Sequence, residues 1–113
     1  MAASARPSHR LVTVMAGYAR DNRLSSVTQR WIDALRRVST QLVLIFDQDH
    51  VEGLEELIAS DQGFVCLCER HGAYDFGSYQ RGLRFAREQQ WLDQATHVLL
   101  CNDSVVGPFR DLE

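Results

Sequence analysis

Four apolar runs rich in Val, Leu and Ile alternate along the chain with segments whose apolar residues recur at helical spacing. The runs cover residues 10–19, 41–49, 63–70 and 97–101, and each predicts a β-strand. The second begins with QLVLIF, a near-continuous apolar stretch that is typical of a strand buried on both faces.

The segments between the runs predict three helices. The first covers residues 27–38 after an N-cap at Ser25 or Ser26. Its buried face is expected to consist of Val27, Trp31, Leu35 and Val38. The second is a short helix after a capping-box pattern of Asp49 and Glu52. The third covers residues 78–92, where apolar and arginine positions alternate.

Strands and helices that alternate in this order predict an α/β fold, because helical crossovers connect neighbouring parallel strands. We expect a Rossmann-like parallel sheet with flanking helices. The 113 residues, 45% apolar and 24% charged, suit one small domain over residues 1–113, with residues 1–9 flexible.

Charge and composition exclude several classes of function. The formal charge is −3, so no basic field attracts nucleic acid. All twelve basic residues are Arg, which excludes a P-loop lysine or a Schiff-base lysine within this chain. No run resembles a signal peptide or a membrane span, so a cytoplasmic location is expected.

The three cysteines, Cys66, Cys68 and Cys101, lie in apolar runs. An odd number of buried thiols predicts reduced cysteines in the core. Cys66 and Cys68 fall on one face of a strand, so a metal site there is the alternative.

Polar residues follow every predicted strand. They include Tyr18; Asp47 and Asp49; Arg70, His71 and Asp75; and Asn102, Asp103 and Ser104. Open α/β sheets bind ligands beyond the carboxyl ends of their strands. We therefore expect a polar, phosphate-bearing ligand such as a nucleotide at this edge.

Two of these residues have a specific expected role and an ordinary alternative. Asp47 can accept hydrogen bonds from a base or a ribose, or can serve the turn and the next helix. Arg70 can pair with a phosphate or with Asp75. The histidines, His50, His71 and His97, lack metal-ligand spacing and are interpreted as surface or hydrogen-bonded residues.

The stretch HGAYDFGSYQRG (71–82) has two interpretations. Gly72 and Gly77 permit unusual backbone angles or close approach of a ligand, and a helix beginning near Ser78 would offer N–H groups to an anion. The alternative is an ordinary loop with an N-cap at Asp75 or Ser78. The arginine stripe of Arg81, Arg84 and Arg87 favours a solvated helix face.

The stretch HVLLCNDSVVGPF (97–109) delivers a carboxylate at the end of a strand. Asp103, with Asn102 and Ser104 beside it, can hold Mg²⁺ or Mn²⁺ against a diphosphate. The same three residue types are also common in turns.

ERHGAYDFGSYQRGL (69–83) and HVLLCNDSVVGPF (97–109) together resemble the rhamnan synthesis F family of glycosyltransferase-related proteins. The resemblance implies a GT-A-type fold that takes a dTDP- or GDP-linked, rhamnose-like sugar donor. It also implies a glycan or lipid-linked glycan acceptor, and contact with the inner face of a membrane. By position, NDS (102–104) stands at the Asp-x-Asp metal motif, although neither outer residue is Asp.

The resemblance also assigns nucleotide contacts. Asp47 takes the place of the carboxylate that recognises the base or ribose, and Arg70 and Asp75 fall in the loop against the nucleotide. Tyr18 completes the expected nucleotide-binding set.

The chain is about half the length of a GT-A domain, and no catalytic base is assigned within it. We therefore expect the nucleotide-binding half of a longer enzyme, inactive as this piece, whose bare sheet edge promotes self-association. The alternative is a non-catalytic binding or assembly module that keeps the sheet. A dinucleotide-binding enzyme is disfavoured because the first strand lacks G-x-G-x-x-G.

Overall fold

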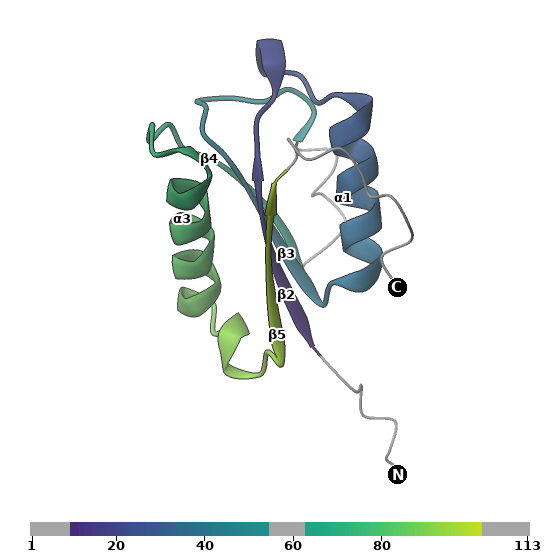
Figure 1. Cartoon of the computed structure of the whole chain (residues 1–113), viewed down its shortest axis with the longest axis vertical. Helices are drawn as coiled ribbons and strands as arrows, with labels where there is room; N and C mark the ends of the chain where they lie inside the picture. Colours follow the sequence, from purple (N-terminus) through teal and green to yellow (C-terminus); the bar gives the residue numbers. More distant parts are fainter. Residues whose placement is uncertain (1–9, 55–62, 103–113) are drawn as a thin grey trace.

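The computed structural model describes residues 10–54 and 63–102, which form a parallel β-sheet with a helix on each face (Figure 1). The strands are β2 (Leu11–Gly17), β3 (Gln41–Phe46), β4 (Phe64–Cys68) and β5 (His97–Asn102). All three strand pairs are parallel. The predicted α/β fold and its four strands are thereby confirmed.

The order of the strands across the sheet is β4-β3-β2-β5. The chain adds strands on one side from β2 to β4 and then crosses to the other side of β2 to add β5. The winding therefore reverses between β2 and β5, and ligands of open α/β sheets bind at such a switch point.

Helix α1 (Ser26–Val38) begins as the sequence predicts, because the Ser25 hydroxyl accepts a hydrogen bond from the backbone N–H of Thr28 at 3.1 Å. Its buried face differs in part from the prediction. Trp31 and Leu35 are buried, whereas Val27 is 50% exposed. The face is rotated towards Ile32, which is fully buried.

The two helices cover opposite faces of the sheet, as Figure 1 shows. Alternate residues of β3 belong to two different core clusters, because successive side chains of a strand point to opposite faces of the sheet. Leu42, Leu44 and Phe46 pack with α1, whereas Val43 and Ile45 pack with α3 (Tyr74–Glu88). β3 is thus buried on both faces, as its apolar run predicted.

Two short 3-10 turns, η1 (Arg20–Asn22) and η2 (Trp91–Asp93), complete the described elements. The predicted third helix, 78–92, is displaced: α3 begins at Tyr74 and ends at Glu88, and Trp91 packs edge-on against Phe85 with ring centroids 5.4 Å apart.

The capping box predicted for the second helix is wrong. Asp49 pairs with Arg70, and Glu52 pairs with Arg23. Residues 55–62, which include the later part of the segment predicted to form that helix, lie outside the described residues.

Candidate functional site at the carboxyl edge of the sheet

Three loops and the end of β5 meet at the carboxyl edge of the sheet. The loops are residues 18–25 after β2, 47–52 after β3 and 69–73 after β4. Parallel strands place their carboxyl ends on the same side, so the residues predicted from four separate segments share one edge. Asp103 and Ser104 lie outside the described residues, and Asn102 is the last residue of β5.

Asp47 holds the loop that leads from β4 to α3. Its carboxylate accepts hydrogen bonds from the backbone N–H of His71 at 2.7 Å and from that of Gly72 at 3.1 Å. The hydrogen bond from His71 is the main reason that the pKa of Asp47 lies below its ordinary value. Gly72 has a φ of +67°, a left-handed conformation that glycine adopts without strain. The carboxylate therefore fixes a tight turn.

The side chain of His71 is buried at the start of this turn. Its Nδ1 accepts the N–H of Ala73 at 3.0 Å, which leaves the proton on Nε2, 2.9 Å from the hydroxyl of Ser78. Nδ1 also lies 3.7 Å from Asp47. The order Asp–His–Ser resembles a nucleophilic triad, but Nδ1 is not a donor to Asp47 and Ser78 is 2% exposed. The three residues therefore fasten the loop to α3. His71 is hydrogen-bonded, one of its two predicted states.

Gly77 does not belong to a ligand-binding loop, as one interpretation of 71–82 expected. It lies in the first turn of α3, where a side-chain Cβ would come within 2.7 Å of the His71 ring. The residue is small because the buried histidine occupies the space. The predicted helix start near Ser78 is wrong, because α3 already begins at Tyr74. Neither Asp75 nor Ser78 is its N-cap.

Arg70 lies on the exposed surface of the edge, where its guanidinium forms two hydrogen bonds of 3.3 Å with the carboxylate of Asp49. This pairing differs from the predicted partner, Asp75. The Asp49 carboxylate raises the pKa of Arg70, with smaller contributions from Asp47 and Tyr18. Arg70 therefore stays charged, and it lies close enough to Asp47 and Tyr18 to interact with both electrostatically.

Gln48 was expected at this edge with Asp47 and Asp49 but without a specific role, yet it is 5% exposed and joins two loops. Its amide oxygen accepts the N–H of Ala19 at 2.5 Å, and its amide nitrogen donates to the carbonyl of Ala19 at 2.9 Å. The same nitrogen reaches the side chain of Asn22 at 2.9 Å. The loop after β2, which contains two left-handed residues, Asp21 and Asn22, is thereby fixed to the loop after β3.

Tyr79 and Asn102 meet beside the switch point. The side chain of Asn102 hydrogen-bonds the Tyr79 hydroxyl and so connects α3 to the end of β5. Partial burial raises the pKa of Tyr79, and the nearby Asp75 adds to that effect. Tyr79 could not be recognised from the sequence as a site residue, because an aromatic residue at helical spacing is expected in the core.

The remaining predicted residues frame the edge. Tyr18 is 66% exposed directly after β2. Asp75 is exposed in the first turn of α3, between Tyr74 and Phe76, which are 84% and 83% exposed. An apolar hollow of about 460 Å³ is lined by Phe76 and other residues at the start of α3 and by Leu100 of β5.

The metal prediction stays a prediction. Of its three residues only Asn102 is described, and no group of three or more His, Cys, Asp or Glu that could hold a metal occurs within residues 10–54 and 63–102. Cys66, Cys68 and Cys101 pack against the core but are each only partly buried, so their predicted burial is met in part and their reduced state stays a prediction.

Among the described residues, no helix is long and apolar enough to cross a membrane.

Comparison with known proteins shows a similarity to part of a virulence protein. The chain is 30% identical over 101 residues to the virulence protein VirA of Vibrio anguillarum, both in strain ATCC 68554 / 775 and in a second sequence from that species. The alignment covers 87% of this chain and 32% of VirA, so the chain spans about a third of the length of the curated relatives it matches. No family model and no solved structure matches the chain.

Proposed function

We propose that this chain is the nucleotide-sugar-binding part of a GT-A-type glycosyltransferase that acts in the synthesis of a cell-surface polysaccharide or O-antigen. The observation that carries the proposal is the meeting of Tyr18, Asp47, Arg70, Asp75 and Asn102 at the carboxyl edge of a parallel sheet, next to its switch point. This is where open α/β sheets bind nucleotides. The resemblance to the rhamnan synthesis F family favours a dTDP- or GDP-linked, rhamnose-like donor.

The residues of the edge divide into a support and a contact surface. The carboxylate of Asp47 accepts hydrogen bonds from two backbone N–H groups and so shapes the loop after β4. Tyr18 and Arg70 are exposed, and the guanidinium can exchange Asp49 for a phosphate, which it matches in geometry. We therefore assign base or ribose contact to Tyr18 and diphosphate contact to Arg70.

The divalent cation implied by the resemblance would be held by Asp103, with the amide oxygen of Asn102 as a further oxygen ligand. Carboxylate and amide oxygens suit Mg²⁺ and Mn²⁺. Bound there, the cation would offset the charge of the leaving diphosphate. Asn102 lies at the end of β5 beside Tyr79, and this neighbour holds the end of the strand in place.

In the complete enzyme, a hydroxyl of a glycan or lipid-linked glycan acceptor would displace the nucleoside diphosphate from the anomeric carbon. The chain aligns with about a third of VirA, so the acceptor site and the general base are assigned to the remainder of such a protein. VirA is named a virulence protein, which accords with an enzyme of surface glycans.

Calorimetric titration of the 113-residue chain with dTDP, GDP and UDP, with and without Mn²⁺, tests the proposal. We expect one nucleotide to bind and Asp103→Asn to weaken it roughly 10- to 100-fold when Mn²⁺ is present, the loss of one charge-assisted contact. Asp33→Asn, which changes an exposed carboxylate on α1, is the matched control. Absence of binding by the wild-type chain, or equal affinities of wild type and Asp103→Asn, would contradict the proposal.

A second candidate is a non-catalytic binding or assembly module on the same sheet. The observation in its favour is that Asp47 and Arg70 are both engaged internally, with backbone N–H groups and with Asp49. Such a module would keep the fold without nucleotide affinity, so the same titration separates the two candidates.

A further inference from the structure

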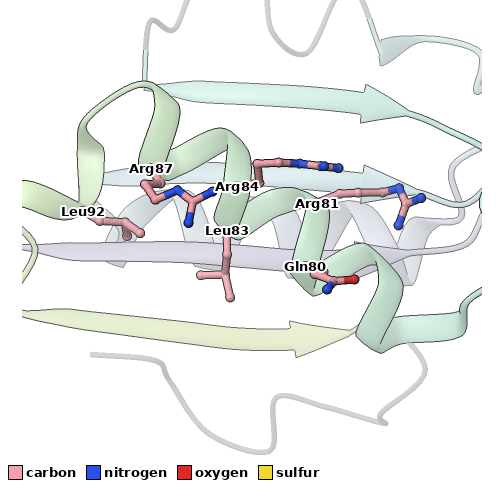
Figure 2. Close-up of a pocket in the computed structure, with 6 residues that line it drawn as sticks. All are labelled: Gln80, Arg81, Leu83, Arg84, Arg87 and Leu92. Atoms are coloured by element: carbon pink, nitrogen blue, oxygen red, sulfur yellow. The ribbon is translucent and has the colours of Figure 1, made fainter.

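The outer surface of α3 carries a hollow of about 580 Å³ that is rich in arginine. It is lined by Gln80, Arg81, Leu83, Arg84, Arg87 and Leu92 (Figure 2). No acidic side chain contributes to this lining, although the chain has a net charge of −3. The lining of the hollow is therefore positive.

The three arginines are not equivalent. Arg81 is partly buried and is neutralised by Glu69, and it also donates to the carbonyl of Gly77 at 3.2 Å. Arg84 and Arg87 are exposed, and within residues 10–54 and 63–102 the structure gives neither of them an ion pair. Two unneutralised guanidinium groups thus lie beside one that already has a partner.

Arg84 and Arg87 lie about one turn apart on the same side of α3. Residues three apart on a helix are neighbours, with Cβ atoms about 5–6 Å apart, and like charges at this spacing repel. Figure 2 shows the guanidinium groups of all three arginines extending in the same direction, towards the N-terminal end of α3. An anion between Arg84 and Arg87 would remove their repulsion.

We infer that this hollow is a second ligand site, which binds a phosphate group through Arg84 and Arg87. A guanidinium presents two parallel N–H donors that match phosphate oxygens. The amide of Gln80 adds a donor, and Leu83 and Leu92 offer apolar contact to whatever carries the phosphate. The site lies along the length of α3, and the inference does not depend on nucleotide binding at the carboxyl edge.

Titration of the full chain with pyrophosphate at low ionic strength, followed by ¹H–¹⁵N NMR, tests the inference. We expect shifts of the Arg84 and Arg87 resonances and an affinity at least tenfold lower for the double variant Arg84→Gln/Arg87→Gln. Arg30→Gln, an exposed arginine on α1, is the control and should leave the affinity unchanged. Circular dichroism checks that the helix persists, since Gln has nearly the helix propensity of Arg.

Vesicles distinguish the source of the phosphate. Co-sedimentation with phosphatidylglycerol vesicles but not with phosphatidylcholine vesicles, abolished in the double variant, would assign the phosphate to a lipid headgroup. Pyrophosphate binding without vesicle binding would assign it to a soluble phosphate compound. No binding in either assay, or equal weakening by Arg30→Gln, would overturn the inference because the effect would then be one of overall charge.

Discussion

The side-chain amide of Gln48 forms a closed pair of hydrogen bonds with the backbone of Ala19, donating to its carbonyl and accepting from its N–H. Both groups are buried. The pair connects the ends of β2 and β3, the strands on which Tyr18 and Asp47 of the candidate site depend.

Replacing Gln48 with Met should destabilise the fold by about 2 kcal/mol. Met keeps the volume but leaves the N–H of Ala19 buried without a partner, at a cost of about 1–3 kcal/mol, whereas the carbonyl of Ala19 keeps its hydrogen bond from the N–H of Asn22. Urea unfolding followed by circular dichroism measures the change. Gln29→Met, on the exposed surface of α1, should shift the free energy of unfolding by no more than about 0.5 kcal/mol. Equal stability of Gln48→Met and wild type would contradict the role given to this amide.

Asp47→Asn should change how stability depends on pH. The folded pKa of Asp47 is lowered, so near and below its ordinary value of 3.8 the unfolded chain binds more protons than the folded one. The contribution of Asp47 is therefore fully present above that value and is lost as pH falls through the folded pKa. We expect the variant to be about 1 kcal/mol less stable at pH 7, because a neutral acceptor bonds more weakly than a charged one.

Chemical unfolding at pH 2 to 7 measures this difference, which should shrink as the solution becomes acidic. Asp33→Asn serves as the control for a carboxylate in solvent. A constant difference between wild type and Asp47→Asn across the pH range would show that the charge of Asp47 plays no part.

Cys66 should react slowly with thiol reagents in the folded protein. Burial, with help from the neighbouring Cys68, raises its pKa to about 12. At pH 8 only about one molecule in ten thousand carries the reactive thiolate, against roughly a quarter for an ordinary thiol. Labelling followed by peptide mass spectrometry, with and without urea, checks this. Fast labelling of Cys66 in the native state, or zinc bound in stoichiometric amount, would contradict the prediction.

The open edge of β5 should cause self-association at high concentration. Val98, Leu99 and Leu100 are 46%, 36% and 44% exposed on a strand whose described pairing is with β2. Exposed apolar edge strands pair with other chains, and a charge on the strand opposes this. Analytical ultracentrifugation should show concentration-dependent mass for the wild type and a shift towards monomer for Leu99→Lys.

Val27→Lys removes a comparably exposed apolar residue from α1 and should leave the association unchanged. A monomeric wild type at high concentration, or equal effects of the two variants, would contradict a role for β5.

Local patterns predicted the strands and the cap of α1 well, because each depends on neighbours in the sequence. Ser25 caps α1 through a hydroxyl three residues from its partner, and QLVLIF needs only its own apolar run to indicate burial. The order of the strands depends on contacts between distant segments, so the pattern could not give it.

The candidate site was harder to predict for a related reason. A glycine in a sequence can indicate either a turn or a lack of space for a side chain. At Gly77 only the structure distinguishes these two explanations, because it shows the His71 ring packed where a Cβ would lie. Gln48 stands between two aspartates and has the composition of a turn, although its amide is buried. Arg70 was expected to pair with a phosphate or with Asp75, but it pairs with Asp49, because the carboxylate within its reach depends on how two loops approach one another.

Gly82 faces β2 so closely that a Cβ at this position would overlap a methyl group of Val14. The two residues therefore divide a fixed volume between them. In related chains that keep this contact, we expect their sizes to vary in opposite directions, so that a larger residue at 82 accompanies a smaller one at 14. Over evolutionary time, such compensating pairs would record the spacing between helix and sheet even where overall identity has fallen too low to detect a common origin.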